Sequence, residues 1–442
     1  MDSADTMGEV LWRALERIDA VPRPLLATLL LGSIVGFVAM IYFALFLIAP
    51  VPREPFRSEK SFRTILPNGD TSDPAPLPCW LDRWRAQHAL ATKKRSGASG
   101  KKAAPVEDTP IEAAEVFMTV VVPAFNEEQR LPGMLEEAVD FLVREYGDAH
   151  GAAVEARAPS TAATAKKEKA IANGAAAGGG SAATTSTAAP SGAAEPANTG
   201  WEILVVSDGS TDGTVSAALS FARSHQLSAY PIAVPGPWKG RGGSGKHIPH
   251  GSIRVVELAQ NRGKGGAVTH GMRHARGKYV VFADADGASR FDDLGKLVDS
   301  CKEVEDAKGK GVAVGSRAHL VGSEAVVKRS KLRNFLMHGF HFLLWLLTPP
   351  ATARIRDTQC GFKLFSRASL PDVVPYMHSE GWIFDVEMLM LAESAGIRVA
   401  EVPIGWKEVQ GSKLNVLKDS IAMFWGLAVL RVAWGTGVYK RS

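Results

Sequence analysis

Two aspartates separated by a single residue give the sharpest chemical signal in this sequence. Asp284 and Asp286 stand in YVVFADADG at 279–287, directly after an apolar run typical of a buried strand. Two carboxylates this close repel each other, and a divalent cation such as Mg²⁺ or Mn²⁺ best explains the pair because it neutralises them. The same cation would bind diphosphate oxygens and stabilise the charge of a leaving group. The pair therefore predicts a metal site.

Three further polar motifs follow apolar runs. They are VVVPAFNEE at 120–128, SDGSTDGT at 207–214 and QNRGKGGAV at 260–268. Open α/β sheets bind ligands at the carboxyl ends of strands, where the first two motifs would place Glu127 and Asp208. The third motif puts Lys264 into a glycine-rich turn before a helix, where cations and amides can face phosphate; a solvated basic loop is the alternative. GRGGSGKH at 240–247 lacks a preceding strand and has His247 where a phosphate loop needs Ser or Thr, so we discount it.

The spacing of apolar residues indicates that an α/β fold with a mostly parallel sheet carries these motifs. From residue 116 on, short apolar runs alternate with helical stretches, as in strands joined by crossover helices. The expected strands are 116–122, 202–207, 253–258 and 279–286, and the expected helices are 131–146, 214–225 and 265–275. Two insertions interrupt this pattern: 148–200 is almost all Ala, Gly, Ser and Thr and predicts disorder, and 231–252 predicts a glycine-rich loop.

One segment is apolar enough to cross a membrane. Residues 25–49 carry no charge, and a helix of that length spans a hydrocarbon layer of roughly 30 Å. A buried core helix and a cleaved signal peptide are the alternatives. We expect an N-terminal tail over 1–24, a juxtamembrane connector over 50–115 and a membrane-associated helix over 416–442. The apolar segments 328–347 and 421–439 read as interfacial or re-entrant amphipathic helices, with a buried core helix as the alternative.

Composition narrows the compartment and the partners. Three widely spaced cysteines fit reduced thiols better than a disulfide framework, which favours a reducing compartment. The net charge of +5 could suggest nucleic acid, but the basic residues are scattered and form no stripe with aromatic residues, so we expect no nucleic-acid partner. Anionic lipid headgroups and phosphates are the expected partners, and the membrane is the expected surface.

Together the motifs resemble a known family. The series PAFNE, SDGSTDGT, NRGKGGAV and DADG is similar to the inverting, nucleotide-sugar-dependent transferases of family 2, which have the GT-A fold. DTQCGFKLF at 357–365, GWIFDVEML at 381–389 and IGWKEVQGSKL at 404–414 resemble the dolichyl-phosphate β-glucosyltransferases. The resemblance covers about 116–420 and the N-terminal span, and places the GT-A domain at 116–415.

The resemblance implies a reaction and a location. Glucose would pass from UDP-glucose to dolichyl phosphate with inversion, giving dolichyl β-D-glucosyl phosphate as a donor for N-glycan precursor assembly. The protein would sit in the endoplasmic reticulum membrane through a single-pass anchor, with its catalytic domain in the cytosol. A dolichyl-phosphate mannosyltransferase using GDP-mannose shares the first four motifs and is the nearest enzymatic alternative. A catalytically silent nucleotide-sugar-binding membrane scaffold is the alternative of another class.

The resemblance also assigns roles to individual residues. Pro123, Glu127 and Asp208 would line the nucleoside pocket with Lys264 nearby, while Asp284 and Asp286 would hold the metal and the diphosphate. The candidates for binding the acceptor phosphate are Arg317, Arg333 and Lys413. Asp357 is the expected orienting group or weak base, and the supporting residues on the acceptor side are Ser316, Gln359, Asp385 and Glu387. Snorkelling at the membrane surface is the alternative for Arg333.

Overall fold

The computed structural model describes residues 22–96, 111–147, 199–239, 244–320, 339, 343–409 and 416–441. The chain divides into two compact units. One comprises Pro52–Met423, and the other comprises Met1–Val51 together with Phe424–Ser442.

A seven-stranded sheet organises the larger unit. Its strand order is β5-β4-β3-β6-β8-β7-β9. The strands are β3 (Val116–Ala124), β4 (Trp201–Ser207), β5 (Ile253–Glu257), β6 (Gly277–Ala283), β7 (Val312–Ser316), β8 (Phe362–Ser366) and β9 (Val399–Pro403). All neighbouring pairs are parallel except those that β8 makes with β6 and β7. The prediction of a mostly parallel sheet is thus confirmed.

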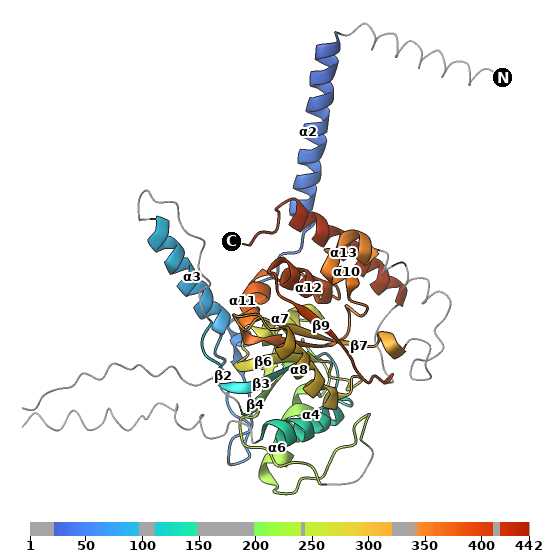
Figure 1. Ribbon diagram of the computed structural model, residues 1–442. Helices are drawn as coiled ribbons and strands as arrows, with labels where there is room; N and C mark the ends of the chain where they lie inside the picture. The colour runs from blue at the N-terminus through green and yellow to red at the C-terminus, as the bar shows by residue number, and fades with distance from the viewer. Residues whose placement is uncertain are drawn as a thin grey trace, which may run out of the picture. The chain divides into compact units, whose positions relative to one another are not determined.

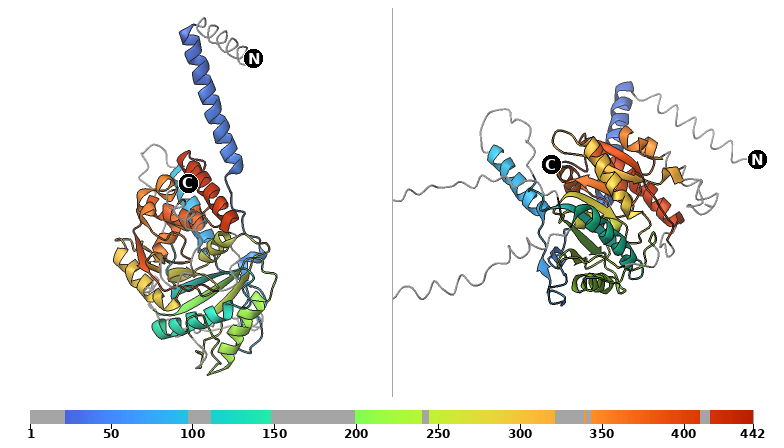
Figure 2. Two further views of the ribbon diagram at one scale, coloured as in Figure 1. Left: turned by 90° about the vertical axis from the view of Figure 1, so that its right-hand side faces the viewer. Right: turned by 60° about the horizontal axis from the view of Figure 1, so that its bottom comes forward.

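Helices cover both faces of this sheet because its central strands are apolar on both sides. Val120 and Val122 of β3 share a core cluster with residues of α4 (Leu131–Tyr146), α6 (Thr214–Leu227) and α8 (Leu294–Val304). The opposite face packs against α7 (Lys264–Met272) and α12 (Phe384–Ser394). In Figure 1 α4 and α6 lie below the sheet and α7 and α12 above it, and Figure 2 shows the same layers from two other sides.

Short elements in the connections between strands and longer helices complete the larger unit. They are η2 (Phe291–Asp293), η3 (Ala318–Leu320), α10 (Pro350–Arg354), η4 (Arg367–Ser369), α11 (Leu370–Val373) and η5 (Val374–Tyr376). The expected insertion at 148–200 lies almost wholly outside the described residues. The described parts of 231–252 are irregular apart from an isolated bridge between Ile232 and Ser244.

Part of the connector predicted over 50–115 has regular structure. Within it, residues 58–96 form η1 (Ser58–Lys60), β1 (Ser61–Phe62), β2 (Ala75–Pro76) and α3 (Trp80–Ser96), which belong to the larger unit. The Trp80 ring is buried, and its indole N–H donates to the carbonyl oxygen of Met272 at 2.8 Å. The Arg63 amide donates to the Val255 carbonyl of the edge strand β5 at 2.9 Å. Such isolated anchors in a polar segment create no apolar period, so the pattern of the sequence concealed them.

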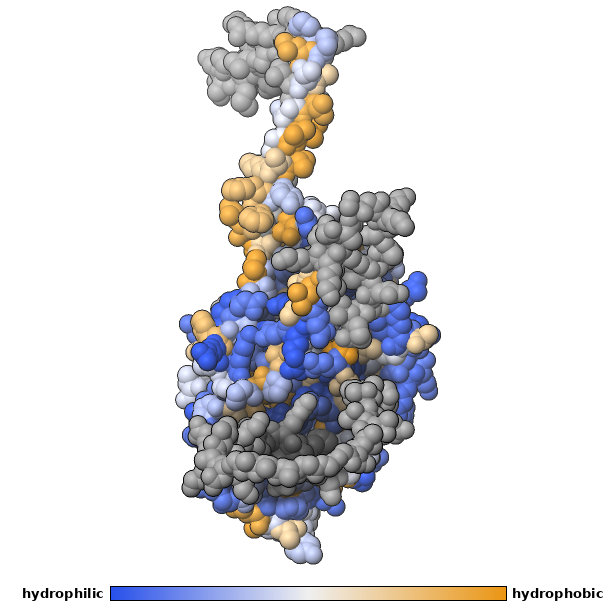
Figure 3. Space-filling view, turned by 90° about the vertical axis from the view of Figure 1, so that its left-hand side faces the viewer, coloured by the Kyte–Doolittle hydropathy of each residue, from blue (hydrophilic) through white to orange (hydrophobic). Residues whose placement is uncertain are grey.

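The smaller unit contains a candidate membrane anchor, α2 (Arg23–Ile48). Its stretch Leu31–Ile48 has a mean hydropathy of 2.5 and is long and apolar enough to cross a membrane. Apolar side chains lie along the length of this helix (Figure 3). The helix α13 (Val416–Gly435) belongs to this unit from Phe424 on and exposes Trp425 and Val432. Most of the expected segment 328–347 lies outside the described residues.

Candidate active site

The carboxyl ends of β3, β4 and β6 open onto a cavity of about 400 Å³. Its lining includes the whole predicted donor-side set: Pro123, Glu127, Asp208, Lys264, Asp284 and Asp286. These side chains come from four motifs that are far apart in the sequence. They meet because β3 lies between β4 and β6, so the chain reverses its direction across the sheet at this point, where open α/β sheets bind ligands.

A left-handed turn ends β3 and ties it to the loop after β4. Asn126 has a φ of 55°, a conformation that Asn tolerates better than most residues. Its side-chain oxygen accepts a hydrogen bond from the Thr211 amide at 2.7 Å. The next amide, that of Glu127, donates to the Thr214 hydroxyl at 2.7 Å, and the Glu127 carboxylate pairs with Arg130. The turn therefore fixes where Glu127 enters the cavity.

Asp208 braces the glycine-rich turn before α7. One carboxylate oxygen accepts the Arg262 amide at 2.7 Å and the other accepts the Gly263 amide at 2.9 Å. Burial raises the pKa of Asp208 to about 6, against the opposing effect of these two amides. Gly263 has a φ of +85°, and a Cβ there would lie 2.7 Å from the Glu380 carbonyl oxygen. Only glycine fits this turn without strain, and the turn positions Lys264.

Lys264 and Asp284, which both line the cavity, form an ion pair. Lys264 Nζ lies 2.6 Å from Asp284 Oδ1. Burial alone would lower the pKa of Lys264, but the carboxylates of Asp284 and Asp385 outweigh it and raise the pKa. The lysine therefore stays charged, and it brings a cation to the place where diphosphate oxygens would lie.

Asp286 is the second carboxylate of the pair. One of its oxygens accepts the Ala288 amide at 3.0 Å, and the other lies 3.9 Å from Arg130 Nη1. Burial and the neighbouring charge of Asp284 both raise the pKa of Asp286. Its charge is thus incompletely neutralised by protein groups, and a divalent cation bound between Asp284 and Asp286 fits this environment.

A glycine on the neighbouring strand leaves room for the first carboxylate. Gly361 lies just before β8, and a Cβ at this position would come within 2.0 Å of Asp284 Oδ2. No side chain can be accommodated there while Asp284 keeps its place. The DTQCGFKLF motif therefore contributes to the position of Asp284 in the cavity because its glycine has no side chain.

Sequence reasoning did not identify four of the polar or aromatic residues that line the cavity: Phe125, Arg130, Asn261 and Trp382. Arg130 follows Glu127 by three positions, the spacing at which side chains of a helical turn meet, and this signal could have identified it. Trp382 lies inside the GWIFDVEML motif, and Lys264 Nζ is 5.9 Å from the centre of its ring. A tryptophan inside a recognised motif was the signal in the sequence that could have identified Trp382 as a cavity residue.

On the acceptor side the structure pairs two of the predicted residues with each other. Arg317 donates from Nε and Nη2 to the two carboxylate oxygens of Asp357, at 2.7 and 2.8 Å. Burial raises the pKa of Asp357, but this bidentate contact outweighs it and holds the pKa below its ordinary value. Neither residue lines the donor cavity. A carboxylate held in this way is a poor proton acceptor, so the contact favours the predicted role of Asp357 as an orienting group over its role as a weak base.

The four supporting residues lie outside the cavity. Asp385 is buried in an ion pair with Lys363, and Glu387 accepts the amides of His378 and Ser379. The expectation that both residues face the site stays a prediction. Ser316 is buried at the end of β7, and Gln359 donates to the Met423 sulfur. The phosphate candidates Arg333 and Lys413 lie outside the described residues.

Comparison with known proteins finds one matching family model and several relatives that are similar over most of this chain. The model for glycosyl transferase family 2 matches residues 246–372. A dolichyl-phosphate beta-glucosyltransferase of Saccharomyces cerevisiae is 33% identical over 93% of this chain and 95% of its own length. One of Drosophila melanogaster is 38% identical over 76% and 79%. One of Homo sapiens is 34% identical over 73% and 77%.

A solved structure with a more distant likeness is glucosyl-3-phosphoglycerate synthase from Mycobacterium tuberculosis in complex with Mg²⁺ and uridine diphosphate. The match covers 72% of this chain and 80% of that chain, with 15% identity and a TM-score of 0.39. A likeness this weak says nothing about the site. The sequence relatives, by contrast, match over most of their length. The chain therefore belongs to the dolichyl-phosphate β-glucosyltransferases, within glycosyltransferase family 2 and its GT-A fold.

Proposed function

We propose that the chain transfers glucose from UDP-glucose to dolichyl phosphate with inversion, releasing UDP and forming dolichyl β-D-glucosyl phosphate. The proposal rests on the cavity that Lys264, Asp284 and Asp286 line, in which Lys264 pairs with Asp284. Two carboxylates and a lysine at strand ends suit a metal-bound diphosphate. The relatives support the choice of sugar and acceptor, since they are named for transfer of glucose to dolichyl phosphate.

Asp284 and Asp286 are the residues proposed to hold Mg²⁺ or Mn²⁺. Among the described residues no group of three or more His, Cys, Asp or Glu side chains could hold a metal ion. Phosphate oxygens and water would complete the ligands of the proposed ion. The bound ion would supply positive charge to the departing UDP. Lys264 adds charge beside it, and Pro123, Glu127 and Asp208 are proposed to line the nucleoside.

The acceptor phosphate is proposed to bind beside Arg317. The carboxyl ends of β6 and β7 and the amino end of the antiparallel β8 lie at one edge of the sheet, so Arg317 lies on the same edge as Asp284. Asp357 fixes the guanidinium of Arg317, which matches phosphate oxygens. A phosphate with a second pKa of about 6 is already largely ionised near neutral pH and needs no strong base. Its oxygen would attack the anomeric carbon opposite the departing UDP, which inverts that centre.

We propose further that α2 anchors the protein once in the endoplasmic reticulum membrane, with the catalytic unit in the cytosol. Cys79, Cys301 and Cys360 are buried free thiols, which supports a reducing compartment. Protease added to sealed microsomes should then digest the catalytic unit. Protection of that unit until detergent is added would contradict this orientation.

One assay tests the reaction directly. Purified full-length protein would be given dolichyl phosphate with radiolabelled UDP-glucose or GDP-mannose in separate reactions, each with Mn²⁺ or with a chelator. We expect label in the lipid fraction only from UDP-glucose and only with the metal. Transfer from GDP-mannose would overturn the choice of donor, and undiminished transfer in the chelator would overturn the metal site.

A further inference from the structure

Residues 231–239, here called the strap, are the first part of the loop insertion and lie along α4. Glu136 Oε2 accepts the Val234 amide at 3.0 Å, and Glu137 Oε1 accepts the Trp238 amide at 2.7 Å and the Lys239 amide at 3.2 Å. Both glutamates are buried, and buried carboxylates are costly unless hydrogen bonds satisfy them. The backbone of the strap supplies those bonds, so its path along α4 is well determined.

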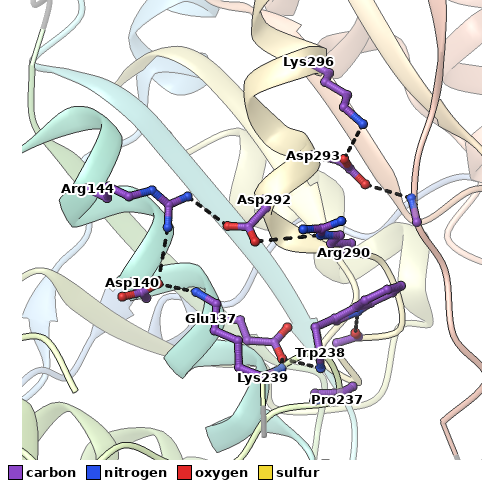
Figure 4. Close-up of polar contacts among 12 residues, drawn as sticks. Glu137, Asp140, Arg144, Pro237, Trp238, Lys239, Arg290, Asp292, Asp293 and Lys296 are labelled. Carbon is purple, nitrogen blue, oxygen red and sulfur yellow. Dashed lines mark hydrogen bonds and ion pairs between the residues drawn. The ribbon is translucent and has the colours of Figure 1, made fainter. Parts of the chain in front are cut away.

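The contacts of the strap form a stripe on α4. Asp140 pairs with Lys239, and Gly133 faces Pro235, whose carbonyl oxygen would lie 2.7 Å from a Cβ at position 133. Positions 133, 136, 137 and 140 have the spacing of one helix face. Figure 4 shows Asp140 and Glu137 on the left and the Trp238 ring on the right, with a dashed line that joins Lys239 to Asp140. The strap is therefore held on α4 from Val234 to Lys239.

Trp238 extends from this strap to the DADG turn. Its indole N–H donates to the Gly287 carbonyl oxygen at 3.1 Å, one residue after Asp286. Gly287 is buried and has a φ of +68°, so the turn it forms is tight. The same turn places the Ala288 amide on the Asp286 carboxylate. The indole thus holds the peptide on which the orientation of Asp286 depends.

The Trp238 ring also covers the segment that follows β9. Lys407 Nζ lies 4.3 Å from the ring centre, and a Cβ at Gly405 would lie 3.1 Å from the ring. This segment pairs with the residues after the DADG turn: Ser289 bridges to Trp406, and the Lys407 amide donates to the Ala288 carbonyl at 2.9 Å. In the same segment, the centre of the Trp406 ring lies 5.7 Å from the Arg317 guanidinium carbon.

We propose that Trp238 is a positioning residue that clamps the junction between the DADG turn and residues 404–407, and so sets the geometry of Asp286 for metal and diphosphate. This role rests on the proposed function of the cavity. Groups behind metal ligands act by orienting them, and their loss weakens metal affinity while the ligands themselves remain. The insertion that departs from the compact family pattern thereby supports the shared metal site.

Trp238→Phe in the full-length protein tests the role because it keeps a ring and removes the indole N–H. The matched control is Trp201→Phe, which removes an indole N–H that donates to the Gly147 carbonyl oxygen at 3.0 Å, away from the cavity. Protein-bound Mn²⁺ is measured by electron paramagnetic resonance at fixed UDP, and the thermal midpoint of each variant reports its folding. We expect Mn²⁺ affinity to fall about tenfold in Trp238→Phe and to stay unchanged in Trp201→Phe.

A kinetic measurement separates positioning from general damage. In Trp238→Phe, saturating Mn²⁺ should restore most of the turnover and bring the KM for UDP-glucose close to that of the wild type. Lys239→Met, which removes the surface ion pair with Asp140, should shift Mn²⁺ affinity in the same direction by a smaller factor. This variant keeps the test decisive if Trp238→Phe does not fold.

The outcomes distinguish the two proposals. Wild-type protein that binds no Mn²⁺ in the presence of UDP would overturn the proposed function and this role with it. Wild-type binding with equal Mn²⁺ affinity in Trp238→Phe and Trp201→Phe would overturn the positioning role alone. If Trp238→Phe does not fold, unchanged affinity in Lys239→Met overturns it in the same way.

Discussion

Lys264 Nζ lies 2.6 Å from Asp284 Oδ1, although the two residues follow different strands of the sheet. The contact neutralises one carboxylate of the Asp284–Asp286 pair and leaves the second with a raised pKa. A cation bound there would relieve the remaining repulsion, and the lysine would still face diphosphate oxygens. The pairing thus explains how the cavity can take a metal and an anionic ligand together.

Replacing Asp286 with Ala should reduce turnover at least about 100-fold because a metal ligand and its charge are lost. The thermal midpoint should change little, since this carboxylate lies in an open cavity. Asp372→Asn is the control, because Asp372 forms a 2.9 Å ion pair with Lys310 outside the cavity. Glucosyl transfer and thermal unfolding are measured on both variants. Retained activity of Asp286→Ala with Mn²⁺ present would refute the metal assignment.

Lys264→Met should weaken binding of UDP about tenfold, since one buried charge-assisted contact is lost. Isothermal titration calorimetry with UDP and Mn²⁺ measures the change directly. Lys310→Met is closely matched: the side chain of Lys310 is 13% exposed against 16% for Lys264, and both pair with an aspartate. An equal loss of UDP affinity in the two variants would argue that Lys264 acts only through general stability.

Gly361→Ala should displace the Asp284 carboxylate, because the new methyl group would lie 2.0 Å from Asp284 Oδ2. We expect at least about a tenfold loss of kcat, comparable with the removal of one electrostatic contact. The control is Gly295→Ala in α8, where a Cβ would meet only the Phe141 ring at 3.7 Å. Activity of Gly361→Ala equal to that of the control would show that Asp284 can move without cost.

The contacts of Glu59 predict that acid weakens the attachment of residues 53–59 to the loop after β5. Its buried carboxylate accepts hydrogen bonds from Arg53 at 2.9 Å, from the Phe56 amide at 2.8 Å and from the Ala259 amide at 2.9 Å. Burial favours protonation, but these bonds outweigh it and lower the pKa of Glu59 from 4.5 to about 2. Because the folded state has the lower pKa, the stabilisation is complete above pH 4.5 and is lost as the pH falls towards 2.

Glu59→Gln should therefore lower the free energy of unfolding by up to about 3 kcal/mol at pH 7 and flatten the loss of stability in acid. Thermal midpoints between pH 7 and pH 3 measure this effect. Glu257→Gln is the control, since Glu257 is paired with Arg63 at 3.4 Å on the surface and such pairs contribute little. Parallel pH profiles for wild type and Glu59→Gln would contradict the link.

Several elements could be predicted because their signals are local. The expected strands at 116–122 and 202–207 match β3 and β4 within two residues, since strands buried on both faces are continuous apolar runs. The helix expected at 131–146 matches α4, whose apolar stripe faces the core. Residues 58–96 were missed because their anchors, such as Trp80 and Glu59, find partners far along the chain.

The sequence by itself determined the order of strands and helices, the apolar span and the donor-side residues, because each depends on neighbours within one motif. Only the tertiary structure decided which side chains meet. It paired Arg317 with Asp357 across 40 positions, placed Gly361 against Asp284 and turned Asp385 towards Lys363 in the core. It also laid Trp238 on the DADG turn. The physical reason is that hydrogen bonds and packing act over distances in space, while motifs record only distances along the chain.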